Sequence, residues 1–181
     1  MKPTDILKHE HEIVLAVLGG AEQEAKQIKG GTAVDTKKVH KMLDFFRTFL
    51  DKCHHSKEER FLFPRLHERG LPREGGPISV MLHEHDLGRN EVKVIADALQ
   101  RYEAGETDAA AQLANGLLQF SAILRDHIEK ENNILFVMAD RLLSPADQEE
   151  LYKAFVAVES EEIGEGVHEE FHQFAHDLMK G

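Results

Sequence analysis

Apolar side chains recur three and four positions apart along most of the chain, which is the pattern of amphipathic α-helices. β-Branched and aromatic residues do not alternate with polar ones over any useful length, so no strand is predicted. Read with its turn residues, the pattern predicts helices over about 5–29, 35–69, 77–103, 107–143, from 145 to the glycines at 164 and 166, and 167–180.

Capping residues and helix breakers set the expected ends of these helices. Thr4 and Asp35 are expected to cap the first and second helices, and Ser144 followed by Pro145 should open the fifth. Pro64 is expected to kink the second helix or to end its regular part, because proline has no backbone N–H to donate.

The helices predict an all-α fold. Four long amphipathic helices joined by short loops favour an up-down-up-down four-helix bundle over residues 1–143. Residues 144–181 are expected to form one or two extra C-terminal helices packed on that bundle.

The two halves of the predicted bundle repeat one another. The segment His9-Glu10-His11-Glu12-Ile13 recurs 74 positions later as His83-Glu84-His85-Asp86-Leu87. The segment from His54 to Phe63 recurs 73 positions later, from His127 to Phe136. The chain therefore reads as two helical hairpins of one design, with a histidine on the first helix and His-x-x-x-Glu on the second.

The repeat selects among neighbouring candidates. Histidine and glutamate four residues apart share one helix face, and the pair His54/Glu58 is kept in the second half as His127/Glu131. The interleaved pair His55/Glu59 is not kept, since Ile128 and Asn132 stand at those places, so His55 and Glu59 are set aside.

The His-x-His segments are resolved in the same way. Residues two apart on a helix point about 200° away from each other, so both histidines of a pair cannot face the core. His11 and His85 fall within apolar stripes, whereas His9 and His83 fall outside them and are expected at the surface. The inward-facing set is therefore His11, His54, Glu58, His85, His127 and Glu131.

Six such groups in a core predict a metal site, because buried histidines and glutamates are costly without partners. Four imidazoles and two carboxylates are too many for one tetrahedral zinc ion, and the mixed nitrogen and oxygen set suits iron or manganese. The Glu-x-x-His order of ferritin-like di-iron bundles is absent at these positions, where histidine precedes glutamate by four.

The order His, His-x-x-x-Glu, Glu-His, His-x-x-x-Glu over about residues 5–141 resembles the hemerythrin-like (HHE cation-binding) family. The resemblance implies a four-helix bundle holding two iron ions with an oxo or hydroxo bridge. It also implies that the four histidines are terminal ligands and that Glu58 and Glu131 bridge the irons.

The chain departs from the oxygen carriers of that family. They have a second histidine on the third helix, four residues from the first, where this chain has Arg89 after His85 and Met81 before it. They also end with an aspartate five positions after the last histidine, where Glu131 stands at four. The remaining set is more similar to bacterial iron-sulfur cluster repair proteins and iron-sensing hemerythrin-like domains.

A histidine row on the last helix, His168, His172 and His176, offers a replacement for the lost ligand. The row as a whole is expected to lie outside the metal site, with Phe171 and Phe174 supplying the packing. His168 begins the helix and is the member best placed to reach the metal, so it is the seventh candidate ligand. Cys53 is expected to be an inert buried thiol.

Charge and composition limit the kinds of partner and the cellular location that we expect for this chain. The net charge of −11 argues against nucleic acid and anionic membrane surfaces. A single cysteine, no apolar stretch long enough to span a bilayer and no signal-peptide core predict a cytoplasmic location. The predicted function is to bind, sense or react with O₂, NO or peroxide at a non-haem di-iron centre. The alternatives are an enzyme-like role in iron-sulfur cluster repair, iron delivery or peroxide and NO detoxification, and a helical scaffold with a structural metal.

Overall fold

The computed structural model describes residues 1–181 apart from the side chain of Glu165, and it is all-α, with no strand in the described part. The first and third long helices are α1 (Pro3–Lys29) and α4 (Pro77–Glu103). The second runs as α2 (Thr36–Phe45), the π-helical segments η1 (Phe46–His55) and η2 (Glu58–Leu62), and α3 (Phe63–Glu68). The fourth runs as α5 (Ala109–Lys130), the π-helical η3 (Glu131–Leu135) and α6 (Phe136–Leu142).

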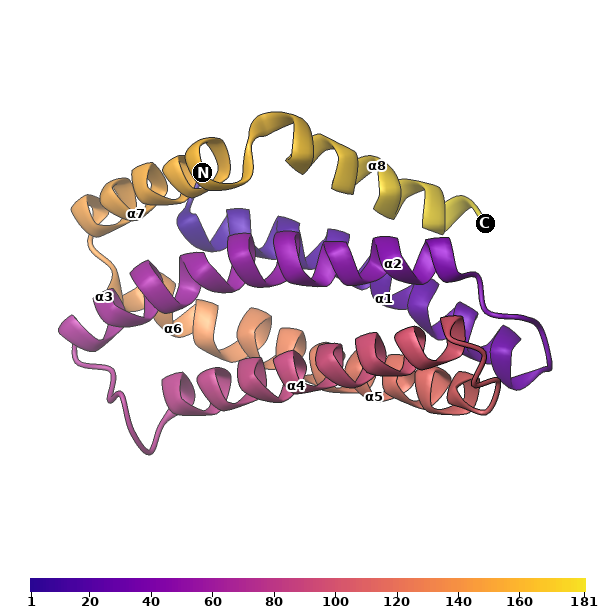
Figure 1. The fold of residues 1–181 in the computed structure, drawn as a ribbon. Helices are drawn as coiled ribbons and strands as arrows, with labels where there is room; N and C mark the ends of the chain where they lie inside the picture. Colours follow the sequence, from indigo (N-terminus) through magenta and orange to yellow (C-terminus); the bar gives the residue numbers. More distant parts are fainter.

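These four long helices lie side by side as an up-down-up-down bundle (Figure 1). After it come α7 (Pro145–Ala157), the π-helical η4 (Val158–Ile163) and α8 (Glu165–Lys180). The three run along one side of the bundle, where α7 and α8 pack against α1 and η4 packs against η1. The Leu178 side chain of α8 lies over Gly20 of α1, where an added Cβ would come within 2.9 Å of it.

The helix ends largely follow the predicted caps. Asp35 Oδ1 accepts a hydrogen bond from the backbone N–H of Lys38, and Ser144 and Asp147 form a capping box before α7. Thr4 was predicted wrongly as a cap. The first helix begins at Pro3 with Lys2 at the N-cap, and the Thr4 hydroxyl instead donates to Asp140 on α6 at 2.7 Å.

Pro64 does not end the second long helix. It lies in the first turn of α3, directly after the π-helical segment η2, and the chain stays helical to Glu68. Because proline has no N–H to donate to the preceding turn, Pro64 interrupts the backbone hydrogen bonds where η2 meets α3, while the backbone stays helical.

Two apolar clusters fill the bundle. One is built around Phe45, Phe46 and Phe120 and takes in Phe174 from α8. The other is built around Leu62, Phe136 and Phe155. Apart from Glu24, the buried histidines and glutamates of the long helices lie between these two clusters, so apolar packing encloses a polar band on both sides.

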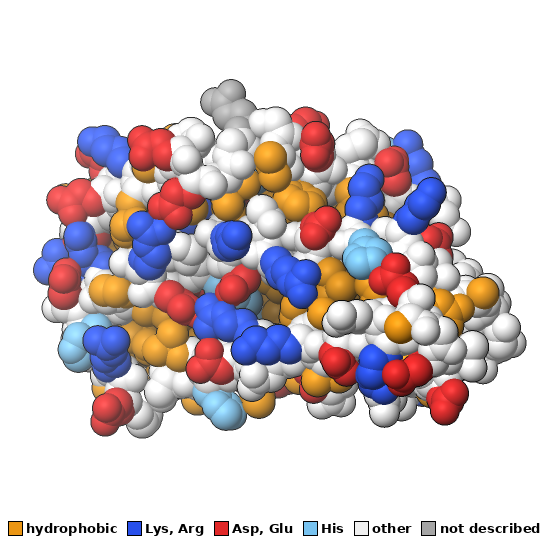
Figure 2. All heavy atoms as spheres, in the orientation of Figure 1, with side chains coloured by type: hydrophobic (Ala, Val, Ile, Leu, Met, Phe, Trp, Pro, Cys, Tyr) orange, Lys and Arg blue, Asp and Glu red, His pale blue; other side chains and the backbone are white. Residues whose placement is uncertain are grey.

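The surface is mixed in charge. Figure 2 shows acidic and basic side chains interspersed over the face seen in Figure 1, with apolar side chains visible between them. No helix among the described residues is long and apolar enough to cross a membrane.

Candidate metal centre

The six side chains that the repeat selected meet in the polar band between the two apolar clusters. Each of them is at most 1% exposed. One comes from α1, one from α4, and two each from the second and fourth long helices, which contain the π-helical segments η1, η2 and η3. They are His11, His54, Glu58, His85, His127 and Glu131.

The four imidazoles turn the same atom inward. His54 Nε2 lies 3.5 Å from Glu58 Oε1, and His85 Nε2 lies 3.3 Å from Glu58 Oε2. In the other half, His127 Nε2 lies 3.3 Å from Glu131 Oε1, and His11 Nε2 lies 3.1 Å from Glu131 Oε2. Each carboxylate therefore presents its two oxygens to histidines from two different helices.

The outward nitrogens form a ring of hydrogen bonds around the bundle. His54 Nδ1 donates to Glu10 at 2.8 Å, and His85 Nδ1 donates to Glu59 at 2.7 Å. The ring continues from His127 Nδ1 to Glu84 at 2.9 Å, and from His11 Nδ1 to Asn132 at 2.7 Å. The imidazoles of the second, third and fourth long helices are thus each held by the helix before them in the chain, and the imidazole of α1 is held by the fourth long helix. In each case the Nε2 atom points to the centre of the band.

This ring obeys the internal repeat. Glu10 and Glu84 are related by 74 positions, and Glu59 and Asn132 by 73. A further layer repeats as well, because Lys57 pairs with Glu10 and Lys130 pairs with Glu84. A carboxylate or carbonyl oxygen behind the histidine is the usual support of a metal-binding imidazole, since it fixes the ring and its tautomer. Sequence reasoning used the repeat to find the inner side chains but missed that it also encodes their supports.

His55, which the repeat excludes from the predicted set, lies beside the six side chains in the structure. It is 3% exposed, its ring stacks on that of His85 at 3.7 Å, and neither ring nitrogen has a hydrogen-bond partner among the described residues. Neighbours diverge by about 100° on an α-helix, but π-helical turns hold more residues, so the divergence is smaller in η1. His54 and His55 can therefore both face inward, and α-helical periodicity could not have shown it.

His168 does not join the other six side chains. Its ring lies against Phe49, and its ligand atoms cluster with those of Glu10 and Glu159. Glu10 is the hydrogen-bond partner of His54, so α8 brings His168 next to a residue that supports a candidate ligand and not into the polar band. The physical reason is that α8 packs on the outer side of α1, which keeps its histidines one layer away.

Arg89, at the place of the missing histidine, points to other groups. Its guanidinium donates to Asp51 at 2.9 Å, to Asp86 at 2.9 Å and to Glu59 at 2.7 Å. It thereby supports the carboxylate that holds His85, and it supplies no ligand.

The electrostatics of the two central carboxylates differ. Burial and the facing charge of Glu131 raise the pKa of Glu58 well above its usual range. Burial acts on Glu131 too, but His127 and His11 outweigh it and hold that pKa well below its usual range. Burial would lower the pKa of His127, yet the charge of Glu131 raises it to about 9.

Burial also shifts the pKa values of three groups around the two carboxylates. Burial lowers the pKa of His54 to about 4, so its imidazole is neutral at pH 7. Burial opposes ionisation of Glu10, but its bonds to His54 and Lys57 lower that pKa to about 2. Burial also raises the pKa of the Cys53 thiol to about 12, which keeps the sulfur protonated.

The side chains fit a pair of cations. The inward Nε2 atoms of the four histidines and all four oxygens of Glu58 and Glu131 are buried with no hydrogen-bond partner in the described part of the chain. Buried polar atoms are rarely left so, and a bound metal would satisfy them together. Two groups have ligand atoms within 4.8 Å of one another and share Glu58: His55, Glu58, His85 and His127, and His11, His54, Glu58 and Glu131.

Curated proteins with similar sequences carry the name iron-sulfur cluster repair protein YtfE. The protein of Pectobacterium carotovorum subsp. carotovorum (strain PC1) is 37% identical over 90 residues, covering 49% of this chain and 41% of that protein. The protein of Edwardsiella ictaluri (strain 93-146) is 35% identical over 120 residues, or 65% of this chain and 53% of that protein. The protein of Salmonella newport (strain SL254) is 41% identical over 91 residues, covering 48% and 40%. The match thus spans about half or less of each relative.

A family model described as the hemerythrin HHE cation binding domain matches residues 2–139. That range is well over half of the chain and contains all of the buried histidines and glutamates of the two ligand groups. The protein therefore belongs to the hemerythrin HHE cation-binding domain family.

Proposed function

We propose that this protein holds a non-haem di-iron centre that binds, senses or reacts with O₂, NO or peroxide. The observation that carries the proposal is the arrangement of Glu58 and Glu131. Each aims its two oxygens at the inward nitrogens of two histidines from different helices, as carboxylates that bridge two ions would.

Seven side chains would hold the ions. His11 and His54 would serve one ion, and His55, His85 and His127 the other. Glu58 belongs to both groups, and Glu131 reaches from His11 of the first to His127 of the second. Imidazole and carboxylate together suit iron, and the similarity to proteins named for iron-sulfur cluster repair supports iron over manganese or zinc. Two iron ions there would supply a redox-active centre to which a small molecule can bind.

The chain's own contribution is orientation and shelter. The ring of Nδ1 hydrogen bonds fixes each imidazole before any ion arrives, and the two apolar clusters exclude bulk water from the band. Burial opposes ionisation of Glu10 and Glu84, but the hydrogen bonds to His54 and His127, together with Lys57 and Lys130 behind them, lower the pKa of both carboxylates.

A second function is favoured by the names of the relatives. As the alternative, we infer an enzyme-like role in iron-sulfur cluster repair or iron delivery, or in the removal of peroxide or NO. Turnover of peroxide or NO by the iron-loaded protein separates this alternative from binding or sensing.

The test is metal content together with absorption. Protein from iron-replete cells is expected to hold two iron ions and to absorb in the near ultraviolet. His54→Ala and Glu131→Ala should lose the band and the iron, whereas His83→Ala, at an exposed position of α4, should keep both. Wild-type protein that holds no iron, or a His54→Ala variant that keeps both ions, would refute the proposal.

A further inference from the structure

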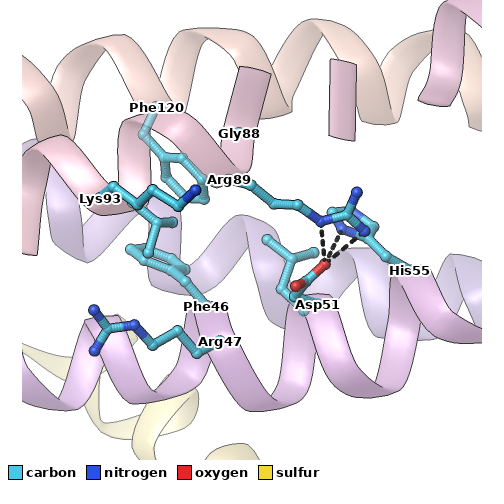
Figure 3. Close-up of a pocket in the computed structure, with 10 residues that line it drawn as sticks. Phe46, Arg47, Asp51, His55, Gly88, Arg89, Lys93 and Phe120 are labelled. Atoms are coloured by element: carbon cyan, nitrogen blue, oxygen red, sulfur yellow. Dashed lines mark hydrogen bonds and ion pairs between the residues drawn. The ribbon is translucent and has the colours of Figure 1, made fainter. Parts of the chain in front are cut away.

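A pocket of about 230 Å³ lies between the second long helix, α4 and α5 (Figure 3). Most of its wall is apolar, with the rings of Phe46 and Phe120 in contact at 4.4 Å between centroids. Gly88 places bare backbone beside them, and Leu50 and Val92 complete the apolar surface. The charged ends of Arg47 and Lys93 stand at the other side of the pocket in Figure 3 and are exposed.

The pocket ends at the candidate metal centre. His55 lines the pocket, and the same residue belongs to the ligand group of Glu58, His85 and His127. Both of its ring nitrogens are buried and without a hydrogen-bond partner among the described residues. One imidazole therefore separates the cavity from the polar band.

A charged pair stands beside that imidazole. Asp51 Oδ1 lies 3.4 Å from His55 Nδ1 and accepts from Arg89 at 2.9 Å (Figure 3). Arg89 reaches back to Glu59, the support of His85. Arg89, which stands where an oxygen carrier has a further histidine, therefore lines the pocket next to the candidate metal centre.

The chemistry of the wall selects what can enter. An apolar cavity binds small apolar molecules, whereas a polar solute leaves hydrogen bonds with water that such a wall cannot replace. A second pocket, whose lining includes His9, Glu10, Glu159 and His168, reaches a support of His54 and not a member of the two ligand groups.

We propose that the apolar pocket is the access site through which O₂ or NO reaches the metal centre, with His55 the first ligand side chain met. The inference rests on the proposed function and narrows it, since it favours apolar diatomic molecules over hydrogen peroxide as the molecules that use this route.

The first experiment uses metal-free protein, so that it does not depend on iron. Xenon, an apolar probe, should shift the methyl resonances of Leu50 and Val92 in a saturable way. Val80, on the same helix but exposed and outside the pocket, should not respond. Val92→Trp fills the pocket and should abolish the xenon response, with Val92→Phe as a less bulky variant if the first does not fold. Xenon that leaves Leu50 and Val92 unshifted would overturn the access site.

The second experiment measures association of NO with the iron-loaded protein by stopped flow. Val92→Trp should slow NO association by about tenfold or more, a barrier increase of ~1.4 kcal/mol, while the matched control Val80→Trp keeps the wild-type rate. The reaction with hydrogen peroxide should be unchanged in both variants. Wild-type NO rates in Val92→Trp, or equal slowing of NO and peroxide, would overturn the inference. A wild-type protein without iron would instead refute the proposed function, and the xenon result would still decide the pocket.

Discussion

The two glutamates that support His54 and His127 should differ sharply when each is replaced by glutamine. In both Glu10→Gln and Glu84→Gln the oxygen that accepts from the imidazole becomes a neutral amide oxygen. Loss of such a support typically costs 10- to 100-fold in metal affinity, or about 1.4–2.8 kcal/mol. We expect both variants to lose affinity for ferrous iron by this amount.

Their effects on folding should not be equal, because the lysines behind them differ in burial. Lys57 is fully buried, and in Glu10→Gln only Glu159 would remain to balance its charge. Removing one partner of a buried ion pair lowers the free energy of unfolding by about 3–5 kcal/mol. Because Glu159 still pairs with Lys57, we expect Glu10→Gln to lie near the lower end, at about 3 kcal/mol. Lys130 is one-third exposed and also pairs with Asp126, so Glu84→Gln should cost about 0–1 kcal/mol.

The assay is urea unfolding of the metal-free proteins, followed by anaerobic titration with ferrous iron against a competing chelator. Glu12→Gln is the control, since its exposed carboxylate lies on α1 outside the ring and should change neither quantity. Equal loss of unfolding free energy in the two variants would refute the argument from lysine burial. Wild-type iron affinity in both would refute the supporting role of the ring.

Three further expectations concern protons and helix packing. A cation requires the unprotonated forms of His127 and Glu58, whose pKa values are raised, so metal uptake at pH 7 should release protons. An indicator dye measures this release, and metal affinity should rise up to about pH 9. Metal uptake without proton release would contradict the expectation. Gly116→Ala should destabilise by about 1 kcal/mol in thermal unfolding, since its new Cβ would lie 2.9 Å from Ile95, and a gain in stability would mean that Ile95 yields. Ser144→Ala should cost about 1 kcal/mol in urea unfolding through loss of the N-cap of α7, and an unchanged midpoint would show that the cap contributes nothing.

The four long helices and six of the buried side chains could be predicted because they follow rules that act along the chain. Helical periodicity, caps such as Asp35 and the 73- and 74-residue repeat need no knowledge of tertiary contacts. The repeat excludes His55, because Ile128 stands at the matching position, but the structure places His55 beside the other ligand candidates on the π-helical segment η1, for which the sequence carries no simple signal.

The position of His168 depended on tertiary structure in a different way. Its spacing along the last helix shows which residues share a face, but not which layer of the bundle that helix contacts. The structure packs α8 on the outer side of α1, so His168 reaches Glu10 and Glu159. Thr4 illustrates the same limit on a smaller scale, since its hydroxyl found Asp140 on α6 in place of its own helix end.

The central claim is that the buried band holds two bridged iron ions. Mössbauer spectra of protein loaded with ⁵⁷Fe, with iron counted per chain, test it most directly. The account predicts two iron ions per chain and, in the oxidised protein, high-spin ferric ions coupled to a diamagnetic ground state. One iron ion per chain, or two that show the magnetic behaviour of isolated ferric ions, would contradict it.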